Sequence, residues 1–448
     1  MTGIAGSMAH HDNNAAGQRH ELCLDGSVKV ALTLFLIYPL FRNLLGGYDV
    51  IWYVSMASAA YLIVRYFDLR LALTLPVVAW LVIAAIALVS FLVLGASATG
   101  SPKRMLTFVV VIVLTITLST RTNWIWPTLN IALVLLSIHA VATLLFATVP
   151  SIYTSFVKPA FFAGDMDAIG YQSGLTAHYS YNGMLLSAGV LLSASRLALV
   201  ERGTRDLKEW LPKVLVFVLF VVALLATSKR GPLIAVAASL VLALFVGSGK
   251  YKFDAFVKII LSVVAGIFVL GILAQVFPQI TAVLDRFQEV TASATDADAT
   301  NGRSYLWARA YELWQSSPII GHGWGTYRYY WEGRLDVATS TAHNVFLNLL
   351  SEVGVVGLLV FLVAAIPPLI GLWRLMSKQM VFTKENRVAV SFAFMFQVFF
   401  FVYSFTGSPL YDVESYIFYV LMSCGIWMAF AFDAKDLGTK YRGGVFND

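Results

Sequence analysis

About twelve apolar runs, each long enough for one bilayer-crossing helix, are separated by short polar stretches along the 448 residues. A helix rises about 1.5 Å per residue, so about 20 apolar residues cross the hydrocarbon core of a bilayer. Hydrophobic residues make up 59% of the chain and charged residues only 12%, a balance that excludes a soluble protein of this length. The sequence therefore predicts an all-α polytopic membrane protein. The runs lie near residues 27–45, 49–66, 71–96, 104–120, 125–148, 178–200, 211–227, 231–248, 255–277, 353–374, 386–407 and 412–433.

The basic residues predict how these runs are oriented. An even number of spans places both termini on one side, and cytoplasmic loops carry an excess of Lys and Arg. Roughly twenty of the 31 basic residues fall on the side of the termini, which is therefore predicted to be cytoplasmic. The net charge of +6 then reflects membrane orientation, and no nucleic-acid partner is expected. The predicted organisation is a tail at 1–26, nine spans over 27–277 with an outer loop at 149–177, a large outer loop at 278–342, three spans over 343–433 and a tail at 434–448.

Two adjacent cations, Lys229 and Arg230, run against this charge bias. They lie in the short hairpin 228–232 on the predicted outer side, where positive charge is disfavoured. One interpretation is that both side chains extend to lipid headgroups. The other is that they hold a phosphate group, because a guanidinium offers a planar fork of donors that matches phosphate oxygens.

The large outer loop contains a predicted amphipathic helix over residues 303–316. Arg303 stands in its first turn, where it either joins exposed amide donors in binding an anion or is a plain surface arginine. The helix is expected to lie on the bilayer surface, because its apolar residues recur at helical spacing. These residues are Leu306, Trp307, Ala310, Leu313 and Trp314.

Alternating glycines, Gly321, Gly323 and Gly325, follow this helix. They favour tight backbone turning over a nucleotide-phosphate loop, because no strand precedes them. The aromatic residues of 324–331 are expected to form either an interfacial belt or a platform for sugar rings.

A histidine stands where the outer loop returns to apolar sequence. Thr341 is predicted to cap the following helix, which places His343 in its first or second position. The positive end of the helix dipole disfavours an imidazolium there, and a general base needs a neutral imidazole. The alternative is a purely structural histidine at the helix end.

Polar side chains continue along one face of this helix. They are expected to face a protein-lined cavity, because polar groups are costly against lipid. Gly354 and Gly357 are expected to permit close helix packing. The polar stripe consists of Asn344, Asn348, Ser351 and Glu352.

Several of these motifs occur together in one known family. His343-Asn344 followed by Gly354-x-x-Gly357, and preceded by Gly302-Arg303 and Gly321-x-Gly323, resembles the O-antigen ligase and O-antigen polymerase superfamily of bacterial inner membranes. The hairpin Ser228-Lys229-Arg230-Gly231 resembles the Ser-Arg-Gly element of that family, with Lys229 inserted before the arginine.

The resemblance implies a GT-C-like, inverting glycosyltransferase that needs no metal or other cofactor. Such an enzyme transfers O-antigen polysaccharide from undecaprenyl pyrophosphate to a sugar hydroxyl of lipid A-core, on the periplasmic side of a Gram-negative inner membrane. The family's catalytic histidine corresponds to His343, and its pyrophosphate-binding arginines correspond to Arg230 and Arg303, beside Lys229. Further site residues implied by the resemblance are Asn344, His178, Asn182 and Asp412, the last in preference to Glu414.

Three alternatives remain open from the residues. Within the superfamily, an O-antigen polymerase joins repeat units on two carriers, and a protein O-oligosaccharyltransferase modifies protein hydroxyls. A transporter of polyprenyl-linked glycans is disfavoured because no matching halves are visible and the polar residues gather near one surface instead of the midplane. The pairs Asp165-x-Asp167 and Asp296-x-Asp298 are interpreted as acidic loops and not as metal ligands.

Overall fold

The structure, a computed structural model, describes residues 25–41, 49–68, 73–95, 101–157, 172–176, 178–198, 207–248, 303–329, 341–377 and 383–440. Within these stretches helices are the only regular secondary structure, which confirms the predicted all-α fold. The predicted ninth span at 255–277 and both aspartate pairs lie outside the described residues.

Every predicted apolar run within the described residues is helical over most of its length. The long helices are α2 (Gly26–Phe41), α3 (Val50–Tyr66), α4 (Leu75–Leu94), α6 (Pro102–Leu118), α7 (Ile125–Thr148), α10 (Tyr179–Leu197), α11 (Leu207–Ala226), α12 (Arg230–Gly247), α15 (Arg303–Ser316), α16 (Val345–Ser377) and α17 (Lys384–Tyr403). The last predicted span comprises α18 (Val413–Tyr419), the π-helical η4 (Val420–Cys424) and α19 (Gly425–Lys440). Short elements are α8 (Pro150–Ile152), η1 (Tyr153–Val157) and the 3₁₀ turn η3 (Thr326–Tyr329).

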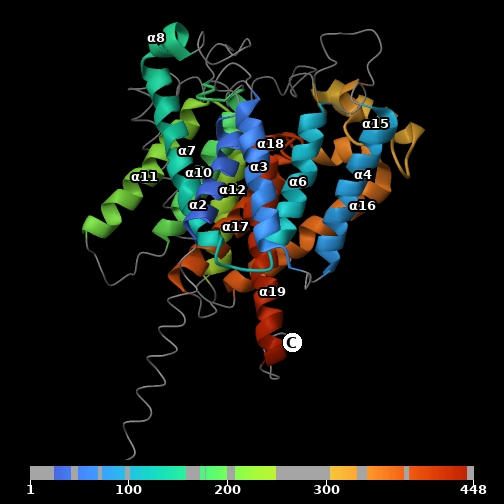
Figure 1. Cartoon of the computed structure of the whole chain (residues 1–448). Coiled ribbons are helices and arrows are strands. Elements are labelled where there is room, and N and C mark those ends of the chain that lie inside the picture. The colour runs from blue at the N-terminus through green and yellow to red at the C-terminus, as the bar shows by residue number, and fades with distance from the viewer. Residues whose placement is uncertain are drawn as a thin grey trace, which may run out of the picture.

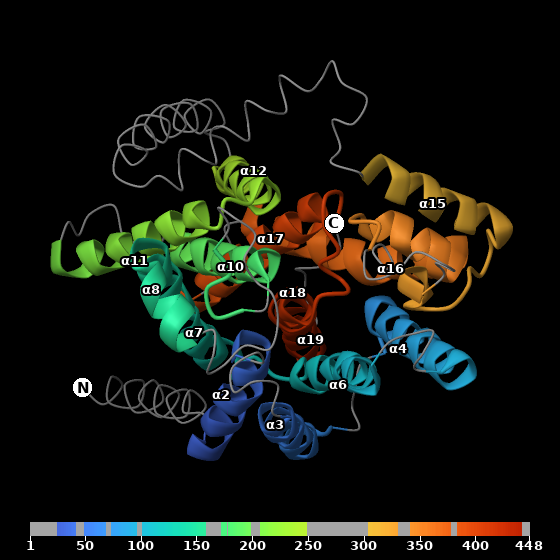
Figure 2. The ribbon, with the colours of Figure 1, turned by 90° about the horizontal axis from the view of Figure 1, so that it is seen from above.

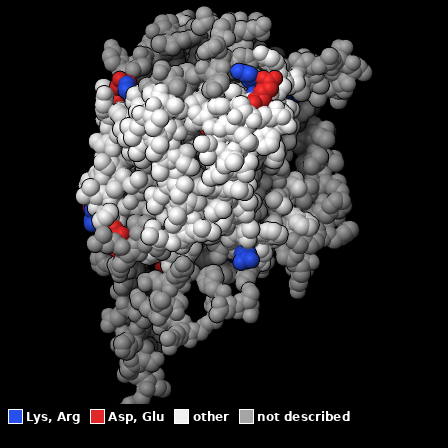
Figure 3. All heavy atoms as spheres, turned by 90° about the vertical axis from the view of Figure 1, so that its right-hand side faces the viewer, with Lys and Arg blue, Asp and Glu red and all other residues white. Residues whose placement is uncertain are grey.

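The protein is a polytopic membrane protein. By length and composition, seven of the described helical segments can cross a membrane: α4, α7, α11, α12, α16, α17 and 413–433. The apolar helices α2 and α3 are shorter. On the face drawn in Figure 3, charged side chains gather near the upper and lower rims, and the broad band between them is apolar or uncharged. This distribution suits a bilayer, whose hydrocarbon core excludes charge.

The most buried helices form the centre of the bundle. Within their spans, α17 is 72% buried and 413–433 is 83% buried, against 28% for α11 and for α12. Seen from above, α17 and α18 lie between the peripheral helices, with α12 on one side and α6 on the other (Figure 2). In Figure 1, α15 lies at the upper end of the bundle and α19 extends toward the lower end.

A break in α16 admits a turn from the loop before it. Gly354 has φ 64° and ψ −167°, a combination open in practice only to glycine. The amide of Val355 donates to the carbonyl of Pro318 at 3.0 Å, outside the helix. A Cβ on Gly354 would overlap the carbonyl of Ile319. The expected helix–helix contact is therefore wrong for Gly354, which packs against a loop backbone.

The alternating glycines form this turn. Gly321, Gly323 and Gly325 have φ of 67°, 110° and 83°, which confirms the predicted tight turning. A Cβ on Gly321 would overlap the backbone of Glu352, and the Gly323 amide donates to the Glu352 carbonyl at 2.6 Å. Glycine at 321 and 354 therefore lets two backbones meet directly.

Candidate active site

His343 lies two residues before α16 and not inside it. The Asn344 side chain caps the helix, because its Oδ1 accepts hydrogen bonds from the amides of Phe346 and Leu347 at 3.0 and 3.1 Å. The prediction that Thr341 is the cap is therefore wrong. His343 itself has φ 48°, in the left-handed region that histidine enters more readily than most residues. The helix thus begins two residues after His343, with Asn344 as its cap.

Hydrogen bonds from three neighbouring segments hold residues 342–345, around His343, in place. The Ala342 amide donates to Asn348 Oδ1 at 3.0 Å, and the Ala342 carbonyl accepts from the indole of Trp307 on α15 at 2.9 Å. The Val345 amide donates to the carbonyl of Ser404, at the end of α17, at 2.9 Å. Because α15, α16 and the end of α17 all form hydrogen bonds with the segment around His343, the half-buried imidazole has a defined position.

Cations surround His343. Burial, and then the charges of Arg303, Lys229 and Arg328, lower the pKa of His343 to about 4. Burial and then Lys229 likewise lower the pKa of His178 to about 4. At neutral pH both imidazoles are therefore uncharged, and the positive charge of this region resides on the Lys and Arg side chains.

Four helices begin around the same point. His178 is the N-cap of α10, Lys229 the N-cap of α12, Arg303 the first residue of α15, and Asn344 the cap of α16. His178, Lys229 and Arg303 all act electrostatically on His343, so these helix starts lie near one another. Each helix start carries partial positive charge from the helix dipole. The arrangement therefore favours an anion electrostatically, with an uncharged imidazole beside it.

The hairpin before α12 brings two cations to this point. Ser228 has φ 57° and is buried, which turns the chain sharply. The ammonium of Lys229 lies 4.2 Å from the ring centre of Tyr179, a cation–π contact with the first turn of α10. Arg230 begins α12, and a Cβ on the next residue, Gly231, would lie 3.0 Å from the ring of Tyr403. Small size at Gly231 thus brings Arg230 close to α17.

The two candidate residues on α10 differ in position. His178 Nδ1 accepts from the amide of Ser180 at 3.1 Å, which leaves the proton of the neutral ring on Nε2. Asn182 is completely buried, and its amide nitrogen donates to Thr143 Oγ1 at 2.9 Å and to the Gln172 carbonyl at 3.1 Å. Asn182 therefore anchors the segment before α10 to α7. His178 instead lies close enough to Lys229 for its pKa to be lowered by that charge.

Asp412 lies at the start of α18, near the same group of helices. Both Asp412 and Arg303 act electrostatically on the hydroxyl of Tyr403. Asp412 is partly exposed, whereas Glu414 is buried. Tyr403, which carried no prediction, therefore links the acidic candidate to Arg303 and to the hairpin of Arg230.

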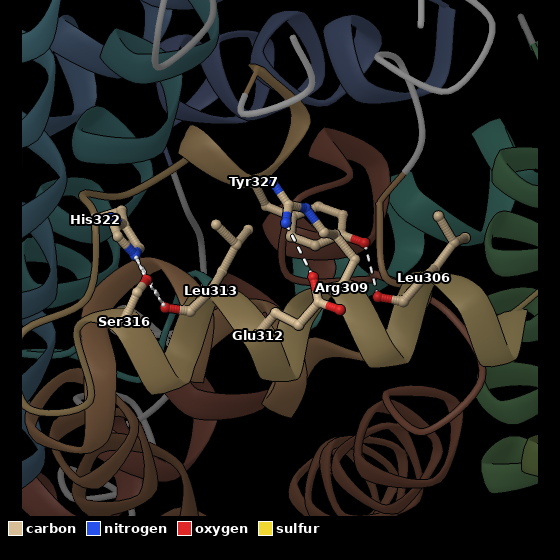
Figure 4. A network of polar contacts seen from close by, with 7 residues as sticks. All are labelled: Leu306, Arg309, Glu312, Leu313, Ser316, His322 and Tyr327. Carbon is tan, nitrogen blue, oxygen red and sulfur yellow. Dashed lines mark hydrogen bonds and ion pairs between the residues drawn. The ribbon is translucent and has the colours of Figure 1, made fainter.

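Helix α15 packs with its apolar face against α16, beside the site. Leu306, Ala310 and Leu313 are buried, which confirms the predicted amphipathic helix, but this face packs on α16 and not on the bilayer. Figure 4 shows how the following turn is tied back to the helix. The Tyr327 hydroxyl donates to the Leu306 carbonyl at 2.9 Å, and His322 Nε2 lies 2.9 Å from the Leu313 carbonyl.

Glu352 is a buried carboxylate on the polar stripe of α16. The sequence did not predict its hydrogen-bond partners. Its Oε2 accepts from the Gly325 amide at 2.9 Å and from the Tyr411 hydroxyl at 2.7 Å, and its Oε1 accepts from the Tyr327 amide at 3.2 Å. Burial raises the pKa of Tyr411 well above its usual value, so this hydroxyl keeps its proton and donates. Asn348, Ser351 and Glu352 of the polar stripe are buried in protein, and Glu352 of these three lines a cavity.

Arg328 is the cation that sequence reasoning missed. It acts electrostatically on both His343 and Glu352, so it lies near both side chains. The charge bias that singled out Lys229 and Arg230 also applies to Arg328, because it falls in the same predicted outer loop as Arg303. The aromatic residues around it drew the interpretation toward sugar stacking instead.

This geometry can carry out one kind of chemistry well. An uncharged imidazole accepts a proton from a hydroxyl, while adjacent guanidinium and ammonium groups stabilise negative charge that grows on a leaving group.

Residues 215–362 of the chain match the family model described as O-antigen ligase. The matched segment includes Lys229, Arg230, Arg303 and His343, and it ends within α16. The match confirms the predicted resemblance to the O-antigen ligase superfamily. No curated protein matches the chain.

Proposed function

Because residues 215–362 match the family model described as O-antigen ligase, we propose that this membrane protein is an inverting glycosyltransferase of lipopolysaccharide synthesis. It transfers O-antigen polysaccharide from undecaprenyl pyrophosphate to a sugar hydroxyl of lipid A-core. The site faces the periplasm of a Gram-negative inner membrane, with both termini in the cytoplasm, since the positive-inside rule favours this orientation. Nucleotide sugars are absent there, so the donor has to be an activated, membrane-carried glycan.

The observation that carries the proposal is the convergence of four helix starts and their cations on an uncharged histidine. In the reaction, His343 removes the proton of the acceptor hydroxyl. The acceptor oxygen then attacks the anomeric carbon of the donor, and the bond from that carbon to the pyrophosphate oxygen breaks. Direct displacement of this kind inverts the configuration at the anomeric carbon.

The leaving pyrophosphate gains negative charge as that bond breaks. We assign its stabilisation to Arg230, Arg303 and Lys229 together with the dipoles of the helices that begin there. Guanidinium groups offer two parallel donors to phosphate oxygens. In this proposal the cations perform the electrostatic task that a divalent metal performs in other glycosyltransferases.

The pKa of His343 predicts how transfer depends on pH. Burial and the neighbouring cations lower this pKa to about 4 from the usual 6.5, so the imidazole remains a competent base at any pH well above 4. The kcat/KM of the free enzyme should stay level from neutral pH to about pH 5 and fall as the pH approaches 4. Steady-state kinetics over this range, with circular dichroism to check folding, would measure it. A midpoint near 6.5 would contradict the electrostatic role given to the cations.

Reconstitution with two acceptors tests the function itself. The purified chain in vesicles receives undecaprenyl-pyrophosphate-linked O-antigen with either lipid A-core or a second molecule of the carrier-linked glycan. The proposal requires long glycan on lipid A-core. Products extended on the carrier instead would identify an O-antigen polymerase, and no product with either acceptor would remove both functions.

A further inference from the structure

A charged cavity lies beside the His343 site. We name it the Arg104 pocket; the empty space within it and at its open mouth is about 690 Å³. Its lining extends from the first turn of α6 to the glycine-rich turn and the segment before α18. Residues of the lining used below are Arg104, Phe108, Trp324, Arg328, Glu352 and Tyr411.

The pocket lies close to His343, because residues that line it also neighbour this histidine. Arg328 lines the pocket and also acts electrostatically on His343. Thr341, two residues before His343, lines it as well. A group held in this pocket would therefore lie next to the proposed base.

The walls of the pocket are aromatic. Trp324 stacks on Tyr411 with ring centres 5.3 Å apart, and Phe108 lies 4.9 Å from Trp324. Phe108 in turn stacks on Tyr416 at 4.4 Å. Such a row offers a rigid apolar surface whose ring carbons can contact the C–H faces of a sugar, with polar groups at its edge.

The charges of the pocket favour an anion. Its lining contains two guanidinium groups, Arg104 and Arg328, and one carboxylate, Glu352. Both oxygens of Glu352 are engaged by the amides of the turn and by the Tyr411 hydroxyl. Among the described residues, neither guanidinium lies within ion-pair distance of a carboxylate. The pocket is therefore electropositive and retains donors for a ligand.

Its position separates the pocket from the hairpin that carries Lys229 and Arg230. That hairpin leads into α12, whereas Arg104 begins α6, and Figure 2 shows these helices on opposite sides of α17 and α18. The two cation groups therefore lie on different sides of the central helices α17 and α18. Since the hairpin suits the pyrophosphate of the donor, the Arg104 pocket suits the other substrate.

We infer that the Arg104 pocket binds an acidic sugar of the acceptor, a uronate or a phosphorylated sugar, with Arg104 and Arg328 holding its acid group. The assignment of this sugar to the acceptor rests on the proposed function. The binding of an acidic sugar is argued from the pocket alone. Arg is suited to both acids, because its fork pairs with carboxylate and with phosphate oxygens.

Binding can be measured without any transfer. The full chain in detergent micelles is titrated with methyl glucuronide, glucose 6-phosphate and the neutral methyl glucoside, and saturation-transfer NMR reports binding. Whichever acid the pocket prefers should bind about tenfold more tightly than the neutral sugar, and Arg104→Gln should abolish that preference. The control variant Arg121→Gln, just beyond the C-terminal end of α6, should retain the preference for the acid. Equal binding of all three sugars to the wild-type chain, or an acid preference that survives Arg104→Gln, would overturn the inference.

A competition experiment tests the assignment to the acceptor. In the reconstituted transfer reaction, the preferred acidic sugar should raise the KM for lipid A-core and leave the KM for the carrier-linked donor unchanged. Competition with the donor would overturn the assignment. If no transfer occurs from any carrier while Arg104-dependent binding persists, the transferase function fails and the acidic-sugar site remains.

Discussion

Replacing His343 by Asn should lower glycan transfer by about 10²–10⁴-fold, the usual contribution of a general base. Asparagine is the informative substitution, because His343 has φ 48° and asparagine tolerates the left-handed region better than alanine does. The side chain is only half-buried, so the variant should fold and insert normally. The rate constant for attachment of glycan to lipid A-core in vesicles is the measurement.

His322→Asn is the matched control for this variant. His322 contacts Ser316 and Leu313 at the end of α15, and it takes no part in the proposed reaction. Its substitution should leave the transfer rate close to that of the wild-type protein. Transfer at the wild-type rate by the His343→Asn variant would remove the imidazole from the mechanism, whereas equal losses in both variants would indicate general damage to this end of the protein.

Gly354→Ala should destabilise the protein strongly, although it adds only one methyl group. A side chain at φ 64° and ψ −167° is strained, and the added Cβ would lie 2.6 Å from the Ile320 nitrogen, besides overlapping the Ile319 carbonyl. Backbone strain of this kind costs about 1–3 kcal/mol, and overpacking adds a similar amount. The turn would then leave α16, and Glu352 would lose the amides of that turn. A fall in the midpoint of thermal unfolding in detergent should report this.

Gly247→Ala provides the comparison for that measurement. Gly247 ends α12 in an ordinary helical conformation, and an added Cβ would meet only the flexible end of Met376 at 3.8 Å. Alanine is favoured over glycine in a helix by roughly 0.5–1 kcal/mol, so this variant should unfold at the same temperature or slightly higher. If the two glycine variants unfold at the same temperature, the break in α16 is not a tight backbone contact.

Local sequence was a good guide to the helices. Each span satisfies its own backbone hydrogen bonds, so a sufficiently long apolar run becomes a helix whatever its neighbours are. The boundaries of α7, for example, coincide with the predicted run at 125–148. The same local reasoning predicted the amphipathic spacing of α15 and the tight turn of the glycines, because both depend on residues only a few positions apart.

Local reasoning was weaker where two segments compete for the same hydrogen bonds. Thr341 has the chemistry of a helix cap, yet its hydroxyl lies 2.7 Å from that of Ser408, and Asn344 caps the helix instead. Gly354 suggested helix packing because its partner, the turn at 317–323, lies some thirty residues earlier in the chain. Spacing alone does not reveal which distant backbone will occupy such a gap.

The sequence by itself determined that this protein is a helical membrane protein, of which residues 215–362 match the O-antigen ligase family model. It also singled out His343, Lys229, Arg230 and Arg303 as residues that composition alone does not explain. Only the tertiary structure decided that four helix starts meet around the imidazole, that Arg328 joins them, and that Glu352 ties the glycine-rich turn into α16. The reason is that helix formation depends on neighbours within one or two turns, whereas the charge and burial of a site depend on segments far apart in the chain, which only packing brings together.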